Sequence, residues 1–542
     1  MSRRSLLLAL LHVPLILPFV LVFGHVFASH SWSALLEFER MAVLAGNTII
    51  LCSIICLFAF PVGIALAVLL FKTDLPGRRV LRSMLGIALC VPLPLFALAW
   101  QSFGGGGWRP WSQGLLPAAI IHALAALPWV VWLTGLALLR VPPELEDDAR
   151  TSASAVNALW NVTLRQALPG IALAALWVVM QAAGEIAVTD LVVARTFAEE
   201  IYTQFVLGGP DGLGRAVVVA LPGTLLSLLV SGLILRRFSS WTTFASSARP
   251  TFIWSLGRYR WLAGTLVTLC IFGYMCVPLA SLLRQTSGGD AGSLPRLFLE
   301  LHRAAYLNAS MLLDSLACAL LAGLLCSAWA LFSTLWASDS PRARTWLFVL
   351  VVALWAVPGP VLGFGLKESI SLLMKVEDVL FGWTSFRPLA DVLYFEPNPL
   401  PVLWAQIARL FPYAVAILWP AVRSIPRDLR ESARVDGAPS WREFWSVVWP
   451  SVRGAFWTST FAVSALAIGE LAASKLVQIP GRTTFVQELF NQMHYGATAT
   501  TASLALIQLL APIALWGLIA WRWSRPRISL SPTPTSGPQH AS

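Results

Sequence analysis

The chain has 542 residues, of which 57% are hydrophobic and only 12% are charged, and its formal net charge at pH 7 is +11. This composition excludes a water-soluble globular protein, in which about a quarter of the residues are charged. The positive charge does not indicate a nucleic-acid partner, because the basic residues occupy short segments between apolar runs. That distribution is typical of the loops of a membrane protein.

About twelve apolar runs have the length that a helix needs to cross a bilayer. The sequence therefore predicts an all-α polytopic membrane protein. The first run follows Met1-Ser2-Arg3-Arg4 and permits two interpretations, a signal peptide or an uncleaved first span; its length favours the span. In chain order the predicted runs cover 6–27, 47–71, 80–100, 115–139, 170–191, 215–235, 261–283, 308–335, 346–366, 401–421, 453–475 and 498–521.

The runs form two parallel six-helix repeats. Gly184-Glu185-Ile186-Ala187 in the fifth run matches Gly469-Glu470-Leu471-Ala472 in the eleventh, and Asn47 opens the second run as Asn308 opens the eighth. A parallel repeat with an even number of spans gives two halves of the same orientation. We expect a first half, a linker, a second half and a disordered tail, at 1–235, 236–260, 261–525 and 526–542.

A polar loop recurs in each half, between its fourth and fifth runs. The copies span 141–169 and 425–450, and charged residues follow a proline at the start of each, which favours a helix start. In the second copy Gly437 can take a positive φ and end that helix. A second amphipathic helix follows at 440–448. Such a helix–turn–helix loop on a membrane surface indicates a docking surface.

These loops resemble the EAA loop of ABC importer permeases, whose pattern is Glu-Ala-Ala, a following Gly and a later apolar-Pro pair. Glu431, Ala433, Gly437 and Pro450 match in the second copy, with Asp436 before the glycine. The first copy departs from the pattern, because Asp147-Asp148-Ala149 replaces Glu-Ala-Ala and Ala153 stands at the Gly position. Trp160 precedes Pro169 by the same distance as Trp441 precedes Pro450, so the extra residues of the first loop lie near its turn.

The resemblance covers roughly residues 40–525 and implies a fused permease with two halves in one chain. The segment Phe71–Arg79 after the second run also resembles this family. Combined with the Gly-Glu pairs, the fused form is similar to the ferric-iron and thiamine permeases. Ferric iron is therefore the first expected substrate, and thiamine or another small solute is the alternative. The expected ATPase-coupling residues are Asp147, Ala149, Ala153, Glu431, Ala433, Asp436 and Gly437.

The same resemblance implies the partners and the mechanism. Two copies of a cytoplasmic ATPase would each receive one loop, and their motion would switch the pore between the two faces of the inner membrane. A periplasmic binding protein would deliver the substrate to outer loops. The chain would need no bound cofactor, because ATP acts on the partner. The outer loops are expected at 101–114, 192–214, 367–400 and 478–497.

The sequence contains no GxxxxGK[ST] or HExxH motif, and its cysteines lie in apolar runs without metal-ligand spacing. It therefore predicts a transport subunit that is neither an enzyme nor a metalloprotein. Glu185 and Glu470 are ionisable groups inside predicted spans, and such groups commonly mark a substrate path. The structural alternatives are an ion pair, for example between Glu470 and Lys475, or hydrogen bonds to the backbone. Weaker candidates are Asp190, Asp314 and Arg409, and the alternative for Asp314 and Arg409 is a contact that holds helices together.

Basic residues concentrate on the side of the two EAA-like loops, which predicts that these loops and both termini are cytoplasmic. Two other classes of protein remain open. An ion-coupled secondary transporter explains the intramembrane carboxylates but not the two helical loops. A membrane-embedded transferase needs a catalytic cluster in an outer loop, and Glu199-Glu200 is the nearest candidate.

Overall fold

The computed structural model describes residues 10–27, 32–33, 37–103, 113–237, 252–288, 293–381, 388–395, 398–479, 481–495 and 499–524. Within these ranges the structure is helical, and its one extended pairing is a bridge between Thr73 and Trp254. The predicted all-α class is thus confirmed. The predicted tail at 526–542, the start of the first run at 6–9 and linker residues 238–251 lie outside the described residues.

Eight of the described helices are long and apolar enough to cross a membrane, and two bent pairs also reach this limit if each pair counts as one span. The bent pairs are α4 (Arg78–Leu89) with α5 (Leu93–Phe103), and α16 (Pro341–Ala356) with α17 (Gly359–Phe381). The eight single spans lie in α3 (Phe38–Lys72), α6 (Leu115–Leu138), the continuous helical run Ala155–Ala183 that ends with α9 (Arg165–Ala183), α12 (Gly212–Arg237), α13 (Arg260–Thr286), α15 (Ala309–Asp339), α19 (Leu400–Arg423) and α25 (Ala499–Ser524).

Every one of the twelve predicted runs coincides with a helix or a bent pair, but two fall short of a span by length and composition. The first corresponds to α2 (Val13–Gly24), which has only 12 residues. The eleventh corresponds to α22 (Trp449–Ile468), which ends at Gly469 instead of continuing to residue 475. The turn that begins at this glycine shortens the predicted span.

The two bent pairs break at equivalent places. The axes of α4 and α5 differ by 104° around Val91-Pro92, and those of α16 and α17 differ by 108° around Val357-Pro358. Proline lacks the N–H that a continuous helix needs, and it drives the residue before it toward extended geometry. Val357 accordingly has ψ 128°. The predicted third and ninth spans are therefore bent helix pairs and not straight rods.

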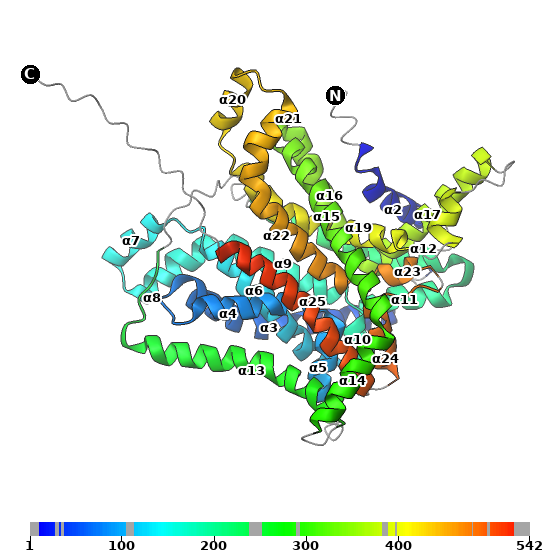
Figure 1. The fold of residues 1–542 in the computed structure, drawn as a ribbon, viewed down its shortest axis with the longest axis horizontal. Helices are drawn as coiled ribbons and strands as arrows, with labels where there is room; N and C mark the ends of the chain where they lie inside the picture. The colour runs from blue at the N-terminus through cyan, green and yellow to red at the C-terminus, as the bar shows by residue number, and fades with distance from the viewer. Residues whose placement is uncertain are drawn as a thin grey trace, which may run out of the picture.

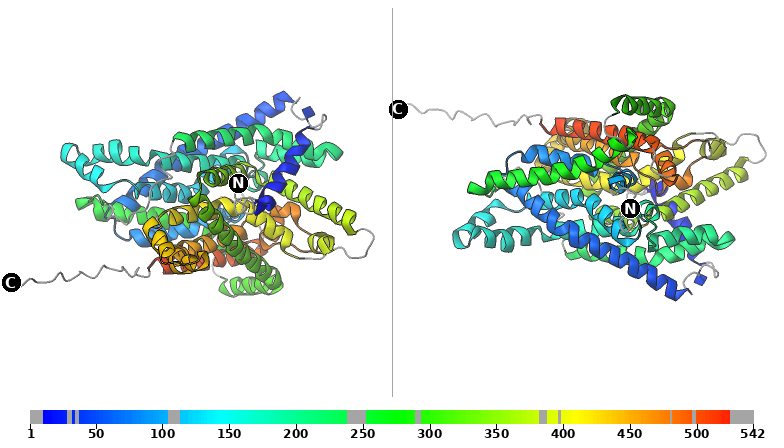
Figure 2. Two further views of the ribbon diagram at one scale, coloured as in Figure 1. Left: turned by 90° about the horizontal axis from the view of Figure 1, so that it is seen from above. Right: turned by 90° about the horizontal axis from the view of Figure 1, so that it is seen from below.

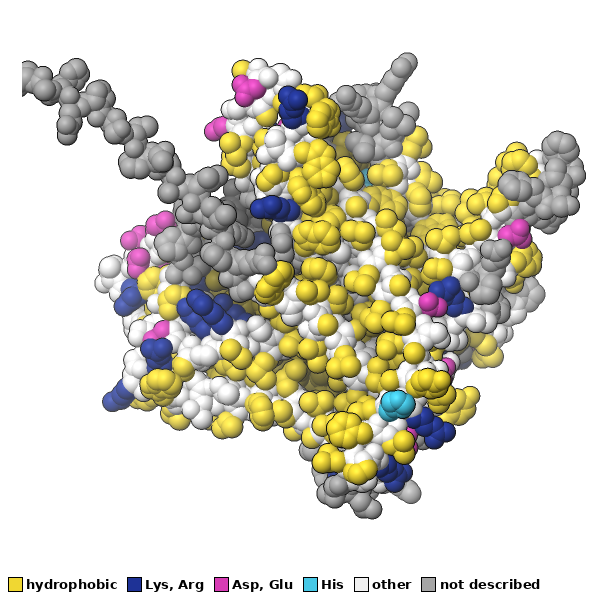
Figure 3. Space-filling model, in the orientation of Figure 1, with side chains coloured by type: hydrophobic (Ala, Val, Ile, Leu, Met, Phe, Trp, Pro, Cys, Tyr) yellow, Lys and Arg dark blue, Asp and Glu magenta, His cyan; other side chains and the backbone are white. Residues whose placement is uncertain are grey.

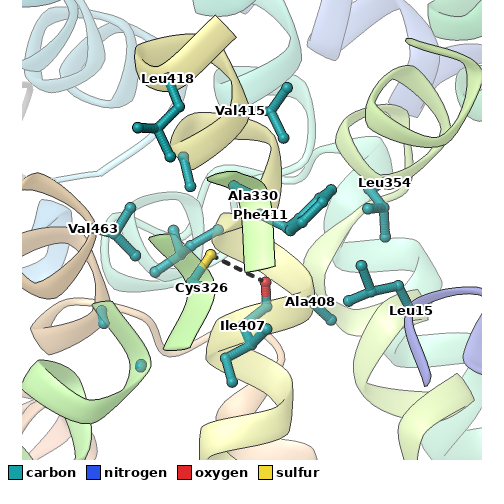
Figure 4. Packing of buried hydrophobic residues seen from close by; sticks show 14 of the residues in the cluster. Leu15, Cys326, Ala330, Leu354, Ile407, Ala408, Phe411, Val415, Leu418 and Val463 are labelled. Atoms are coloured by element: carbon teal, nitrogen blue, oxygen red, sulfur yellow. Dashed lines mark hydrogen bonds between the residues drawn. The ribbon is translucent and has the colours of Figure 1, made fainter. Parts of the chain in front are cut away.

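Each half has its own hydrophobic core. The first lies among α3, α4, α6 and α9, and the second among α15, α16, α19 and α22. Figure 4 shows the second core, in which Phe411 and Leu418 of α19 lie among side chains from neighbouring helices. Leu15 of α2 reaches into this core from the first half.

The first helix of each half packs against the other half. Helix α2 lies along α17, and α13 lies along α4 and α5 of the first half (Figures 1 and 2). The Tyr274 hydroxyl of α13 donates a hydrogen bond to the Leu124 carbonyl of α6, with an O···O distance of 3.1 Å. The predicted halves thus exchange their first helices, so they do not pack as two independent units.

Four aromatic side chains join the two cores. Trp177 of α9 stacks on Trp355 of α16, with ring centroids 5.6 Å apart, and contacts Tyr413 of α19 edge-on at 4.9 Å. Trp129 of α6 completes the group at 4.8 Å from Trp177. Aromatic pairs of this geometry add about 0.5–1.5 kcal/mol beyond the burial of their area. The halves therefore share an apolar, aromatic contact at their centre.

The outer surface is that of a membrane-embedded protein. Figure 3 shows hydrophobic side chains over most of one face, while acidic and basic side chains gather toward its left, top and lower right edges. Exposed leucines on α12 and α13 belong to this apolar surface. Lipid tails cover such a surface without cost, whereas water does not.

Candidate functional site

The first polar loop folds as a helix–turn–helix. Helix α7 (Pro143–Ser152) begins at a proline and ends where Ala153 becomes extended, with φ −143°. The Ser154 hydroxyl then caps α8 (Ala155–Ala158) by accepting the Asn157 N–H at 3.4 Å. A π-helical segment over Leu159–Leu164 leads into α9.

The second polar loop has the same order of elements. Helix α20 (Arg427–Val435) is followed by α21 (Ser440–Glu443) and a π-helical segment over Phe444–Val448. Gly437 has φ +75°, and the Ala438 N–H donates to the Ala433 carbonyl at 3.0 Å. The predicted glycine turn and second helix are confirmed. The first loop needs no glycine because Ala153 and Ser154, which join α7 to α8, are both extended. This turn is shorter than the one between α20 and α21, so the expectation of extra residues near the first turn is wrong.

Both loops protrude from the helical body. In Figure 1 the α7–α8 pair stands out at the left and the α20–α21 pair at the top. The predicted coupling residues lie on these helices: Asp147, Ala153, Glu431, Asp436 and Gly437 are exposed, and Ala149 and Ala433 are half-buried. These positions are therefore accessible to a partner.

Large apolar side chains are exposed at matching positions of the two loops. Leu145 and Leu429 lie in the first turns of α7 and α20 and are 42% and 52% exposed. Trp160 and Trp445, each the second residue of its π-helical segment, are 70% and 57% exposed. Exposed aromatic residues within an otherwise polar surface are typical anchors of a protein–protein interface. The two loops thus present the same arrangement of one leucine and one tryptophan.

An ion pair fastens each first loop helix to the end of a long span. In the first half, Lys72 Nζ at the end of α3 lies 2.6 Å from Glu146 Oε2, and both side chains are fully buried. The Thr163 hydroxyl donates to the other oxygen of Glu146 at 2.8 Å. A buried charge pair is stabilised when further hydrogen bonds satisfy its members, as the Thr163 hydroxyl does for Glu146.

The second half carries the same tether with its charges reversed. Arg430 occupies the position before Glu431, as Glu146 does before Asp147, and it lies 2.8 Å from Asp339 at the end of α15. Arg430 and Arg434 also bind Glu443 of α21. Burial of Glu443 raises the pKa of its carboxyl group, but the two guanidinium groups lower this pKa by more. The pKa of Glu443 therefore lies below its ordinary value. The pKa of Arg430 is raised by its hydrogen bond to Asp339.

Glu185 and Glu470 occupy equivalent helix breaks inside the protein. Glu185 Oε1 and Oε2 accept the N–H groups of Ala187 and Val188 at 2.6 and 2.9 Å, at the start of α10 (Ala187–Leu191). Glu470 accepts two N–H groups in the same way at the start of α23 (Ser474–Val477). Backbone hydrogen bonding was one of the alternatives that the sequence left open, and the structure shows it for both residues.

Each of these breaks meets the proline break of the opposite half. A Cβ atom added at Gly469 would lie 2.9 Å from Cβ of Pro92, so only a glycine fits there without displacement. At Gly184 the added atom would lie 3.9 Å from Cβ of Pro358, an ordinary contact. Each half therefore contributes two interrupted segments, and these pack against those of the other half.

The weaker intramembrane candidates have structural partners. Asp190 Oδ2 lies 3.0 Å from His494 Nε2 of α24 (Phe485–His494), which links the two halves. Asp314 pairs with Arg482 at 3.1 Å, and the Arg409 guanidinium donates to the Val357 carbonyl at 3.0 Å. The expectation that Asp314 and Arg409 hold helices together agrees with these contacts.

The proposed equivalence of Asn47 and Asn308 is wrong. Thr48 accepts the N–H of Phe197, just as Ser315 accepts the N–H of Phe485, each at 2.9 Å. Asn47, just before Thr48, therefore corresponds to Asp314. Asn308 lies at the junction before α15, where its side-chain amide donates to the Ala304 carbonyl, whereas Asn47 lies within α3, so the two asparagines share only their residue type.

No catalytic or metal centre is found in the described part of the chain. No group of three or more His, Cys, Asp or Glu side chains there could hold a metal ion. Glu200, part of the candidate transferase cluster, is 2% exposed and binds Arg40 at 2.7 Å and Gln204 at 2.6 Å. It is a buried structural carboxylate.

Known proteins similar to this chain were found by sequence. A family model described as "Binding-protein-dependent transport system inner membrane component" matches twice, over residues 59–239 and 323–530. The molybdenum transport system permease protein ModB of Escherichia coli K12 is 29% identical over 198 residues, which is 33% of this chain and 86% of the relative. No solved structure matches.

Two further relatives show the same partial coverage of this chain. The sulfate transport system permease protein CysW of Synechococcus elongatus is 29% identical over 167 residues, 29% of this chain and 56% of the relative. The putrescine transport system permease protein PotI of Escherichia coli K12 is 22% identical over 223 residues, 36% of this chain and 79% of the relative. Each relative thus aligns with about a third of this chain, as expected for a repeated unit.

Sequence reasoning missed the residues that hold the loops in place. Lys72 and Glu146 are distant in sequence, and nothing in either segment shows that α7 folds back to the end of α3. A signal was available for Lys72, because it is a lone charge at the end of a long apolar run. The reversed pair of Arg430 and Asp339 is likewise distant in sequence, and it forms only because α20 folds back to the end of α15.

Proposed function

The chain belongs to the family of binding-protein-dependent transport system inner membrane components, and on this basis we propose that it is a permease of an ATP-driven importer with two halves in one chain. The chain itself is a transport subunit, and ATP hydrolysis belongs to a separate chain. The observation that carries the proposal is the pair of helix–turn–helix loops, each tethered to the end of a long span in its own half. The alternative of an ion-coupled transporter does not explain two such loops.

We propose that two ATPase copies bind this permease, one at each loop. The shared exposed Leu–Trp arrangement supports one binding mode at both loops. A periplasmic binding protein would dock on the opposite face, at the predicted outer loops. Parts of these loops, including 104–112, 382–387 and 396–397, lie outside the described residues.

The coupling role of the second loop can be tested at its glycine turn. Gly437→Val should weaken docking of the ATPase, because a β-branched residue at φ +75° costs about 1–3 kcal/mol and should displace α21. Ala153→Val is the matched control, since the extended backbone at Ala153 accepts valine. Co-purification with the ATPase measures the effect. Equal ATPase binding by both variants would contradict the proposed role of Gly437.

For the substrate we propose ferric iron, supported by the resemblance of Phe71–Arg79 and the Gly-Glu pairs to iron permeases. A second candidate is an oxyanion, because the names of ModB and CysW refer to molybdenum and sulfate. ATPase stimulation by the binding protein loaded with ferric iron, molybdate or sulfate distinguishes the candidates. Stimulation by an oxyanion and not by iron would reject the first proposal.

We propose that both loops and both termini face the cytoplasm, supported by the concentration of basic residues on that side. Single cysteines at the exposed positions Ser152 and Ser440, in a cysteine-free background, report the orientation. An impermeant thiol reagent should label them in inverted vesicles and spare them in intact cells. Labelling of either cysteine in intact cells would require the opposite orientation.

We propose that the substrate path passes the helix breaks at Glu185 and Glu470. The convergence of broken segments from both halves supports this location, since irregular backbone at membrane depth is tolerated where it lines a cavity or is buried in protein. Because backbone amides bind their oxygens, we assign these carboxylates the role of shaping the path at the breaks.

A further inference from the structure

The last residues of the linker between the halves pair with the first half. The Trp254 N–H donates to the Lys72 carbonyl at 2.7 Å, and the Asp74 N–H donates to the Trp254 carbonyl at 3.2 Å. The Leu256 N–H donates to the Asp74 carboxylate at 2.9 Å, and Trp254 is only 8% exposed. This segment, residues 252–256, is therefore fixed on the turn between α3 and α4.

The same segment contacts the first docking helix. Cζ of Arg150, in the last turn of α7, lies 5.3 Å from the ring centroid of Phe252 and 5.9 Å from that of Trp254. A guanidinium within about 6 Å of an aromatic centroid is attracted by the ring. Lys72 completes the junction, because its carbonyl binds the linker while its ammonium group binds Glu146 of α7.

On its other side the segment continues directly into the second half. A short 3₁₀ turn over Gly257–Tyr259 leads into α13, which packs along α4, α5 and α25. Arg260, the first residue of α13, lies 3.9 Å from Asp74. Gly264 packs so closely on Pro76 that an added Cβ would lie 2.5 Å from Cγ of that proline. A movement of α7 can therefore reach α13 through a few side chains that are in direct contact.

We propose that residues 252–256 form a brace that passes ATPase-driven movement of α7 to α13, the exchanged helix of the second half. The inference rests on the proposed function, because it assumes that an ATPase moves α7. In this arrangement the linker is more than a tether. It makes the first docking loop and the first helix of the second half move as one unit.

The test measures coupling in the full-length permease, reconstituted in lipid vesicles with its ATPase and binding protein. The readout is the amount of substrate transported per ATP hydrolysed. Arg150→Gln removes the cation–ring contact from an exposed position without opening a core cavity. By the strength of such contacts at exposed sites, it should lower this ratio about two- to fivefold. Trp254→Ala removes the centre of the brace and should lower the ratio further.

Tyr259→Ala is the matched control, because this exposed residue follows the brace and its ring contacts Arg258 of the same turn. It should leave the ratio unchanged. A cysteine pair, Arg150→Cys with Phe252→Cys in a cysteine-free background, allows a rescue. A short bifunctional methanethiosulfonate reagent should restore coupling by linking α7 to the brace, and dithiothreitol should abolish it again.

An unchanged ratio in both Arg150→Gln and Trp254→Ala would overturn the brace, and so would a cross-link that fails to raise coupling. A reduced ratio in Tyr259→Ala equal to that in Arg150→Gln would also overturn it, because the effect would then not depend on contact with α7. Failure of the unmodified permease to couple to any ATPase would be a different result. It would reject the proposed function itself, and the brace with it.

Discussion

Replacing Lys72 with methionine is expected to destabilise the permease by about 3–5 kcal/mol, because it leaves Glu146 as a fully buried carboxylate without its cation. Thr163 still donates one hydrogen bond to Glu146, but a neutral hydroxyl cannot replace the ammonium charge. The turn that binds the brace also includes Lys72, so we expect α7 to detach from α3. Thermal unfolding of the purified protein in detergent measures the loss.

A second substitution separates the cost of the unpaired charge from the cost of losing the side chain. Glu146→Gln in the Lys72→Met background removes that charge, keeps the contact with Thr163 and should recover most of the stability. Asp339→Asn, at the equivalent tether of the second half, is the control, because Asp339 is 54% exposed and such pairs contribute at most about 1 kcal/mol. If the single variant Lys72→Met were as stable as Asp339→Asn, Lys72 and Glu146 would not form a buried, charged ion pair.

The sequence predicted local backbone conformation correctly where one residue type determines that conformation. Gly437 ends α20 with a positive φ, as its position predicted, and the helix–turn–helix form of both loops followed from prolines and charged helix formers. The apolar runs located the spans, although α3 begins nine residues before its predicted run at 47–71 and α22 ends seven residues before the end of its predicted run at 453–475. These features depend on neighbours along the chain, which a sequence displays directly.

Features that depend on distant neighbours could not be read in this way. Hydropathy marks α2 and α13 as apolar, but lipid and another helix are equally suitable partners for such a surface, so their exchange between halves left no signal. The bends at Pro92 and Pro358 were similarly ambiguous, because α3 and α6 continue through Pro61 and Pro128. The two prolines at which a span bends, Pro92 and Pro358, are those that pack against the Gly469 and Gly184 breaks of the opposite half.

The reversed tethers suggest how two similar halves in one chain avoid mispairing. If α7 were placed on the end of α15, Glu146 would meet Asp339, and if α20 were placed on the end of α3, Arg430 would meet Lys72. Both wrong pairings bring like charges together, which is unfavourable in a buried or half-buried site. The charge reversal therefore favours docking of each loop on its own half during folding.

Replacing both Glu185 and Glu470 with glutamine is expected to abolish transport and to lower the thermal stability of the permease. Each carboxylate accepts two backbone N–H groups with its two oxygens, whereas a glutamine amide offers only one acceptor oxygen. One buried N–H then loses its partner at each break, at a cost of about 1–3 kcal/mol. Glu470→Gln alone should cost more than Glu185→Gln, because Glu470 is 8% exposed while the Glu185 side chain is 18% exposed.

The control for charge is Asp190→Asn, which removes a carboxylate from the same break region without touching these backbone hydrogen bonds. If the carboxylates act by shaping the path, the glutamine variants should lose stability and transport together, and Asp190→Asn should transport normally. If they act by attracting a cation, the glutamine variants should keep their unfolding temperature and lose transport, and Asp190→Asn should lose part of it. Transport by a stable double variant at the unmodified rate would remove both glutamates from the path. The predicted path would then have to be sought elsewhere between the halves, beginning with the aromatic contact of Trp177 and Trp355.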